Sequence, residues 1–394
     1  MVGLLTATLM SVGLLTPPAL ADVRPDQQWY LDAMNSSGLW EVSKGKGVTV
    51  AVIDSGVKPT PGLTGRLVPG KSFTSEDPDP HEDVDGHGTE IAALIAGSGA
   101  GNTLRGLAPE TKILPLRTHV EEGFFSSHEP IIKAIRYAAR SDAKIINISQ
   151  GVSGVDDETY TALQDAIDEA NKRGKLVFAS AGNQGLKTKT HYPASLPGVV
   201  AVGAVDETGT VADFSNHGPY LTLSAPGVPG GTSQASAIAS ASAALIWAKH
   251  PDWTNHQVLR VMVETTGMSQ RGEEPSMYLG HGIVRPAQVL VDGDGDPGPA
   301  DVSPIFSKYY ASLEASKSPS PEDGEADGKN EGPPTAKPGK EQEQGDEQVA
   351  AQEGTGDSGP PWTAIGIGAA VLVAVAAVVT AIAFRRRTPA QPRY

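Results

Sequence analysis

Three short motifs place an aspartate, a histidine and a serine in settings that suit nucleophilic catalysis. The segment VIDSG ends an apolar run and contains Asp54, DGHGT opens a helical pattern and contains His87, and GTSQA opens another and contains Ser233. A serine hydroxyl is a weak nucleophile, so it needs a histidine that takes its proton and then returns it to the leaving amine. An aspartate beside that histidine fixes its tautomer and stabilises the imidazolium. We therefore expect these three residues to form a catalytic triad.

The elements that must position these residues follow an alternating pattern. The run from Gly47 to Asp54 is β-branched without polar alternation, which is typical of a central parallel strand covered on both faces. Further strand-like runs follow with helical patterns between them; the runs are 112–116, 144–149, 175–179 and 198–202, and the helices are 129–139 and 157–173. This alternation predicts an α/β fold with a parallel sheet, in which functional residues gather beyond the carboxyl ends of the strands.

The order of the triad along the chain resembles that of the subtilases. Aspartate, histidine and serine stand in this order, at spacing similar to that family, over residues 27–291. The nucleophile elbow of α/β-hydrolases is not met, because Ala235 stands where that motif has its second glycine. The resemblance implies a subtilisin-like three-layer α/β fold with a mostly parallel central sheet. It also implies a serine endopeptidase that cleaves protein or peptide substrates through an acyl-enzyme.

The same resemblance assigns roles to two more segments. The segment SAGN is similar to the family segment whose asparagine completes the oxyanion hole, which implies that Asn183 and the backbone N–H of Ser233 bind the oxyanion. The segment NISQG is similar to the strand edge where subtilases bind an extended peptide. This implies a substrate-binding role for Ser149, Gln150 and Gly151, through backbone hydrogen bonds.

Composition divides the chain near residue 291 and excludes several classes of function. Of the net charge of −15, residues 292–361 carry −11, from 16 acidic residues and 5 lysines. This Pro/Gly-rich segment cannot bury enough apolar surface to offset its entropy loss on folding, so we predict a disordered linker. The absence of cysteine excludes a thiol nucleophile and a thiolate metal site. Basic and aromatic residues do not cluster before residue 291, so we expect no nucleic-acid partner.

Two acidic segments raise the question of a cation. The run between residues 76 and 85 holds six carboxylates, the ligands that calcium prefers. We favour a solvated loop here, with a calcium site as the alternative. The segment DGDGD at 292–296 imitates an EF-hand loop, but Pro297 stands where that loop needs glycine. We therefore expect no metal and no cofactor.

Both ends of the chain carry membrane signals. Residues 1–21 are apolar and end in Ala-Leu-Ala, which predicts a signal peptide, although its basic start is missing and an uncleaved anchor stays the alternative. Residues 362–384 form a predicted transmembrane helix, because 22 uncharged residues from Thr363 to Phe384, at ~1.5 Å each, span a bilayer core of ~30 Å. Three arginines open the basic tail 385–394, which we place in the cytoplasm. The prediction is a single-pass type I protein of the cell membrane. An N-terminal extension (22–46) and an extracytoplasmic peptidase domain (47–291) then precede the linker.

This architecture resembles the mycosins, membrane subtilases of actinobacterial type VII secretion. The resemblance implies partners among the secretion membrane components and contact with the lipid bilayer through the C-terminal helix. The sequence departs from the subtilase pattern at Ala237, where the family often has proline, and at two further places. Glu90 stands where histidine or an apolar residue is common, and only three residues separate Gly227 from Gly231, where subtilases usually have a longer excursion. A scaffold that stabilises a secretion complex without proteolysis is therefore the second hypothesis.

Overall fold

The computed structural model describes residues 25–74, 79–119, 128–185, 191–227, 229–267 and 274–317. The predicted signal peptide, transmembrane helix and basic tail lie outside these residues, as does the linker beyond residue 317. Within the described part of the chain, no helix combines the length and the apolar character needed to cross a membrane.

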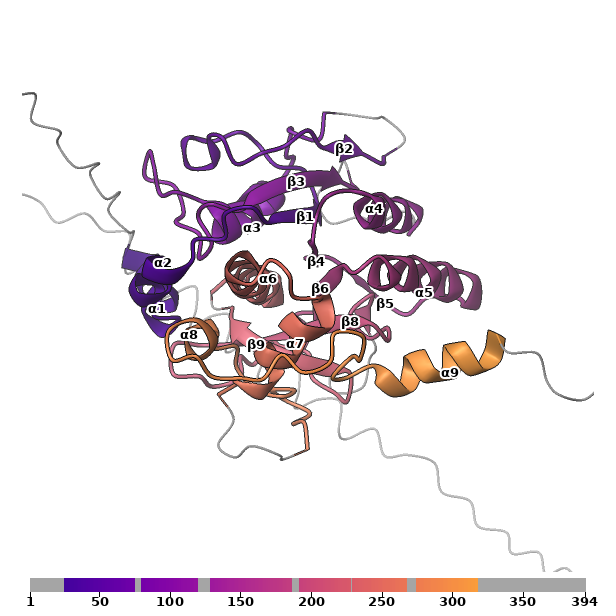
Figure 1. The fold of residues 1–394 in the computed structure, drawn as a ribbon. Helices are drawn as coiled ribbons and strands as arrows, with labels where there is room; N and C mark the ends of the chain where they lie inside the picture. The colour runs from indigo at the N-terminus through magenta and orange to yellow at the C-terminus, as the bar shows by residue number, and fades with distance from the viewer. Residues whose placement is uncertain are drawn as a thin grey trace, which may run out of the picture. The chain divides into compact units, whose positions relative to one another are not determined.

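A seven-stranded sheet forms the centre of the described fold (Figure 1). Its strands, in spatial order, are β2 (Lys71–Ser72), β3 (Lys112–Arg117), β1 (Thr49–Asp54), β4 (Ile145–Ile148), β6 (Leu176–Ser180), β8 (Val199–Val205) and β9 (Leu221–Pro226). Every neighbouring pair is parallel. The five strands expected from the sequence are confirmed, and β2 and β9 complete the edges. A separate antiparallel pair joins β5 (Val152–Ser153) to β7 (His191–Tyr192).

Helices cover both faces of the sheet, as the predicted three-layer fold requires. Along β1, Val50 and Val52 pack with one buried cluster, whereas Ala51 and Ile53 pack with another. The first cluster includes residues of α3 and α6, and the second includes residues of α4 and α5. Figure 1 shows these two pairs on opposite sides of the sheet. The helices are α3 (His87–Ala96), α4 (Glu129–Arg140), α5 (Asp157–Lys172), α6 (Thr232–Lys249), α7 (Asn255–Glu264) and α8 (Pro286–Leu290), with a short 3-10 helix at Pro61–Leu63.

The helix α6 runs through the interior because its side chains are small. It is rich in alanine and serine, and nearly all of its residues are buried. Its hydroxyl groups find partners on β4: Asn147 Oδ1 accepts hydrogen bonds from Ser236 Oγ (2.8 Å) and Ser240 Oγ (3.1 Å). These bonds fix the helix against the sheet, and Ser233 lies in its first turn.

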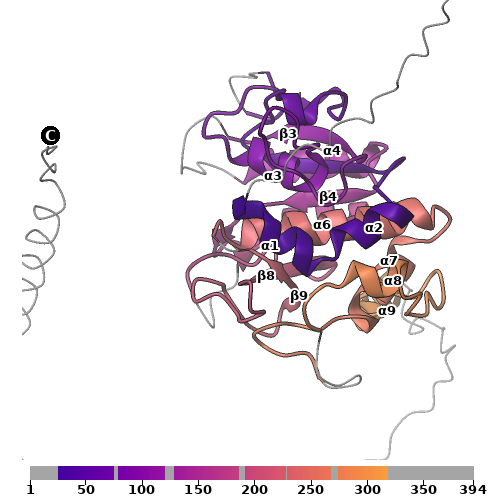
Figure 2. The ribbon, with the colours of Figure 1, turned by 90° about the vertical axis from the view of Figure 1, so that its left-hand side faces the viewer.

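The N-terminal extension is part of the fold. It forms α1 (Pro25–Ala33) and α2 (Ser36–Val42), with Leu31 and Leu39 fully buried. Ser43 Oγ donates a hydrogen bond to Leu245 O of α6 (2.7 Å), and Figure 2 shows α1 and α2 lying over that helix. Trp29 and Trp40, which are partly buried, pack against the same core cluster as Leu31.

The described structure continues beyond the boundary predicted at residue 291. Residues 292–317 continue the fold and end in α9 (Ser307–Lys317). Thr254 Oγ1 donates to Ala300 O (2.7 Å), and Tyr309 Oη donates to Asp168 Oδ2 (2.8 Å). Ile305 and Phe306 pack against the core. The average composition of residues 292–361 is acidic and polar, so it did not reveal the apolar side chains near residue 305. These side chains bury enough surface to order residues 292–304.

Candidate active site

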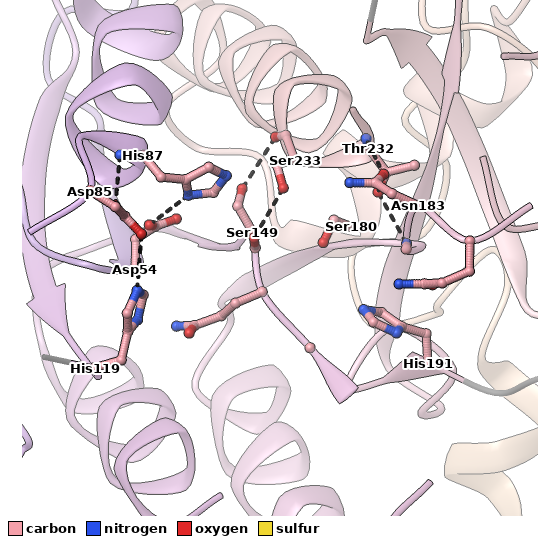
Figure 3. A pocket seen from close by; sticks show the side chains of 14 residues that line it. Asp54, Asp85, His87, His119, Ser149, Ser180, Asn183, His191, Thr232 and Ser233 are labelled. Atoms are coloured by element: carbon pink, nitrogen blue, oxygen red, sulfur yellow. Dashed lines mark hydrogen bonds and ion pairs between the residues drawn. The ribbon is translucent and has the colours of Figure 1, made fainter. Parts of the chain in front are cut away.

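A cavity of about 240 Å³ lies at the carboxyl ends of adjacent central strands (Figure 3). Because β1, β4 and β6 are neighbours, Asp54, Ser149 and Ser180 come together at this edge of the sheet. The cavity is lined by Asp54, Asp85, His87, His119, Ser149, Gln150, Gly151, Ser180, Gly182, Asn183, Gln184, His191, Thr232 and Ser233. Every candidate site residue from the sequence is in this set.

Asp54 and His87 form a direct pair. Asp54 ends β1 and is 1% exposed, and its Oδ1 lies 2.8 Å from Nδ1 of His87, the first residue of α3. Burial of the imidazole opposes its charged form, but the carboxylates of Asp54, Asp85 and Glu90 together outweigh this and raise the pKa of His87 to about 9. The pair leaves the other ring nitrogen, Nε2, available to act on a proton.

A second buried carboxylate organises the turn before His87. Asp83 is 3% exposed, and each of its oxygens accepts one backbone N–H, from Gly86 (3.0 Å) and from Thr89 (2.8 Å). Ser55 Oγ donates to Asp83 Oδ1 (2.7 Å) and accepts from Gly88 N (3.0 Å). The solvated-loop interpretation of the acidic run is therefore wrong for Asp83. Among the described residues, no group of three or more His, Asp or Glu side chains is arranged to hold a metal ion.

Ser233 lies in the first turn of α6 with its hydroxyl in the cavity. Its Oγ donates a hydrogen bond to Ser149 O (3.0 Å), and no hydrogen bond joins it to His87 in the described structure. Gly231 caps the helix with φ 120°, a conformation that favours glycine. A Cβ on Gly231 would also lie 2.7 Å from Asn183 Nδ2. The glycine thus permits Asn183 to approach the start of α6.

The side-chain amide of Asn183 has a fixed orientation. Its Oδ1 accepts hydrogen bonds from Thr232 N (2.9 Å) and Thr232 Oγ1 (2.8 Å). Thr232 Oγ1 in turn accepts from Gly182 N (3.0 Å). Figure 3 shows the amide nitrogen of Asn183 directed towards Ser233. A hydrogen-bond donor is therefore held in the cavity beside the hydroxyl group.

The segment 149–151 continues from β4 along the cavity. The Ser149 and Gln150 side chains are buried and bonded inside the protein: Ser149 Oγ donates to Ser233 O (3.2 Å), and Gln150 Nε2 donates to Thr118 Oγ1 (2.5 Å). A Cβ on Gly151 would lie 2.5 Å from Tyr192 O. The Ser149 and Gln150 side chains are thus held by the protein, and Gly151 leaves its main chain open to the cavity.

Three titratable residues of the cavity were not predicted as site residues from the sequence. Asp85 Oδ1 accepts the backbone N–H of His87 (2.9 Å), and His119 Nε2 lies 3.6 Å from Asp85 Oδ2. His191 is 6% exposed, and burial lowers its pKa, so its imidazole is neutral near pH 7. Neither His119 nor His191 stands in a motif that a single sequence reveals. The motif DGHGT contained Asp85, but nothing in it distinguished a bonded carboxylate from an exposed one.

Comparisons with known proteins agree with this geometry. A profile described as the Subtilase family matches residues 45–282. A subtilisin of Bacillus pumilus is 36% identical over 257 residues, covering 61% of this chain and 90% of the relative. A thermophilic serine proteinase of Bacillus sp. (strain AK1) is 42% identical over 192 residues. The latter alignment covers 48% of this chain and 46% of the relative, about half the length of each.

Similar solved structures include proteases of secretion systems. The MycP3 protease from the type VII (ESX-3) secretion system has a TM-score of 0.60 and 29% identity, covering 68% of this chain and 88% of that protein. MycP1 from Mycobacterium smegmatis has a TM-score of 0.62 and 26% identity, covering 72% and 89%. The fold of the described residues is thus similar to that of mycosins.

Proposed function

The chain belongs to the subtilase family of serine endopeptidases, and from this we propose that it hydrolyses peptide bonds with Asp54, His87 and Ser233 as its catalytic triad. The observation that carries the proposal is the 2.8 Å bond between Asp54 and His87 in the cavity that also holds the Ser233 hydroxyl.

Proton transfer follows from the contacts of His87. Asp54 holds Nδ1, so the tautomer with a free Nε2 is the one that accepts the Ser233 proton. The Ser233 hydroxyl first rotates away from Ser149 O, since a hydroxyl has a single proton to donate. Its oxygen then attacks the substrate carbonyl, and His87 passes the proton to the leaving amine as the acyl-enzyme forms. Water, deprotonated by the same imidazole, hydrolyses the ester.

Two donors stabilise the charge that develops during attack. The Ser233 N–H lies at the N-terminal, positive end of α6, and the Asn183 amide nitrogen lies beside it. The main chain of 149–151 binds the substrate as an added strand, so that the scissile carbonyl sits between Ser233 and Asn183. Release of Ser149 O from the hydroxyl group frees that acceptor for the substrate.

A fluorophosphonate probe tests the proposal directly, since it labels only an activated serine. The full-length protein in detergent should be labelled, and Ser233→Ala should abolish the labelling. Ser180→Ala is the matched control, because Ser180 also lines the cavity but belongs to no triad. Labelling that persists in Ser233→Ala, or is absent from the wild-type protein, contradicts the proposal.

The finer proposal is a membrane-anchored, extracytoplasmic peptidase that acts with type VII secretion components. Its support is the uncharged segment 362–384 with the arginines after it, and the likeness to the MycP1 and MycP3 structures. Removing residues 362–394 should release the protein from washed membranes. External protease should digest the peptidase domain in intact cells and leave the basic tail protected; the opposite pattern rules out the proposed topology.

A scaffold without obligatory proteolysis is the second candidate. It is favoured by the three-residue spacing before Gly231 and by the resting bond of Ser233 Oγ to Ser149 O. The two candidates separate in the producing cell. Export that survives Ser233→Ala but fails after deletion of the whole gene supports the scaffold, whereas export that fails in both supports the peptidase.

A further inference from the structure

We propose that Glu90 and Gln234 form a clamp that positions His87 and Ser233 relative to one another; this inference rests on the proposed peptidase function. Gln234 Nε2 donates a hydrogen bond of 2.6 Å to Glu90 Oε1. Glu90 is three residues after His87 in the first turn of α3, and Gln234 directly follows Ser233 in the first turn of α6. The bond therefore ties the two helices together beside the residues that must exchange a proton.

The clamp also holds the short segment that leads into α6. Gln234 Oε1 accepts a hydrogen bond from Gly230 N (3.1 Å), so the amide of Gln234 is used at both ends. A Cβ on Gly230 would lie 1.8 Å from Gln234 Nε2, so a larger residue at this position would displace the Gln234 amide. One side chain thus links the main chain before Ser233 to the helix that begins with His87.

The chemistry of the three groups allows a single arrangement. Because Gly230 N–H is a donor, the amide oxygen of Gln234 faces it and the amide NH₂ faces Glu90. The partner at position 90 must then be an acceptor, and a carboxylate makes a stronger, charge-assisted bond than a neutral group. Histidine or an apolar residue at position 90 would not supply that acceptor in the same way. Glu90 and the short segment before Gly231, which both depart from the subtilase pattern, are thus held by the same Gln234 side chain.

Glu90 has a second effect on the same site through its charge. The negative charges that face the His87 imidazole are Asp54 from β1 and Asp85 and Glu90 from the start of α3, and each favours the imidazolium. A neutral residue at position 90 therefore makes His87 lose its proton at lower pH. A residue that only held the helices together would not change the pKa of His87. The pH profile of kcat/KM therefore reports on the charge of Glu90, and kcat reports on how His87 and Ser233 are positioned.

The experiment compares four full-length proteins: wild type, Glu90→Gln, Gln234→Glu and the double substitution. Gln234→Glu sets two carboxylates against each other, and we expect kcat on a peptide substrate to fall about tenfold or more with KM little changed. In the double substitution the amide NH₂ at position 90 again faces a carboxylate, so kcat should return to within about threefold of Glu90→Gln. Thermal unfolding of all four proteins shows whether each is folded.

Glu90→Gln keeps an acceptor for Gln234 and tests the charge alone. The acid limb of its kcat/KM profile should move to lower pH, while Glu110→Gln, an acid at the amino end of β3, should leave the limb in place. A double substitution no more active than Gln234→Glu, or a limb that does not move in Glu90→Gln, would overturn the clamp. Wild-type protein that neither cleaves peptides nor reacts with the fluorophosphonate probe would instead overturn the proposed function.

Discussion

The two sides of the catalytic cavity are built from different kinds of group. The side formed by β1 and the start of α3, here the charged side, contains Asp54, Asp85 and His87 in the cavity wall and the buried Asp83, which lies outside the wall but is bonded to the same turn. The side formed by the ends of β4 and β6, the start of α6 and β7, here the neutral side, contains Ser149, Asn183, Thr232 and Ser233, together with the buried imidazole of His191. In the proposed reaction, the charges on one side set the pKa of the base, and uncharged donors on the other side bind the oxyanion.

This difference separates two kinds of kinetic effect. A substitution on the charged side should change the pH at which His87 gains its proton, as well as the rate. A substitution on the neutral side should change the rate and leave that pH where it is. The acid limb of the kcat/KM profile therefore distinguishes the two sides, and the following variants test the distinction.

The largest effect is expected from Asp54→Asn. The carboxamide cannot stabilise the imidazolium and favours the wrong tautomer, so kcat should fall about 10⁴-fold. His87 must be neutral to accept a proton. With its pKa at about 9, wild-type kcat/KM should rise with pH up to about that value. Residual activity of the variant, measured from pH 5 to 10, should show a limb at clearly lower pH. An unchanged limb would mean that Asp54 does not control His87.

A smaller loss is expected from Asn183→Ala on the neutral side. Removing an oxyanion donor lowers kcat about 10² to 10³-fold, because the donor acts in the transition state and not on the bound substrate. KM and the acid limb should both stay near their wild-type values. Steady-state kinetics across the same pH range give all three quantities. A limb that moves together with the rate would contradict the division into a charged and a neutral side.

Asp83→Asn tests a residue of the charged side that does not touch the substrate. Each carboxylate oxygen accepts a backbone N–H, and a carboxamide has only one oxygen, so one buried N–H loses its partner. This should reduce the free energy of unfolding by about 1–3 kcal/mol and lower kcat by about tenfold. Asp79→Asn is the control, because Asp79 is exposed and caps a turn. Equal midpoints of thermal unfolding for both variants would show that the hydrogen bonds of Asp83 do not stabilise the turn before His87.

The sequence predicted the central strands, and that Asp54, His87 and Ser233 would share one site, because both predictions depend on local signals. Asp54 and Ser233 stand in short motifs, and β1 is an uninterrupted apolar run. Three features depended on tertiary contacts and were not predictable in this way. Asp83 is buried and accepts hydrogen bonds from Ser55 and from residues on either side of His87. His191 belongs to β7, which pairs with β5 beside the cavity. Residues 292–317 are ordered by a few apolar side chains within an acidic segment. Composition and periodicity describe neighbouring residues along the chain and contain no information about such long-range contacts.

The smallest effect concerns His191, a titratable group on the neutral side. Its burial lowers its pKa, so it is uncharged where the enzyme works and His191→Gln should leave the acid limb of kcat/KM unchanged. In the unfolded chain His191 binds a proton near pH 6.5, whereas in the folded chain it binds a proton only at lower pH. Folding stability should therefore rise with pH through this region and fall as the pH drops below it.

Thermal unfolding between pH 5 and 7 measures this dependence, which should be weaker in His191→Gln than in the wild-type protein. The same variant should change the preference for the side chain before the scissile bond by no more than about tenfold, because His191 packs against Gly151 at the wall of the cavity. His281→Gln is the matched control for the preference measurement, because burial also lowers the pKa of His281 but this residue lies outside the cavity. A shift of the acid limb in His191→Gln would show that a charge titrates on the neutral side, and the comparison between the two sides would fail.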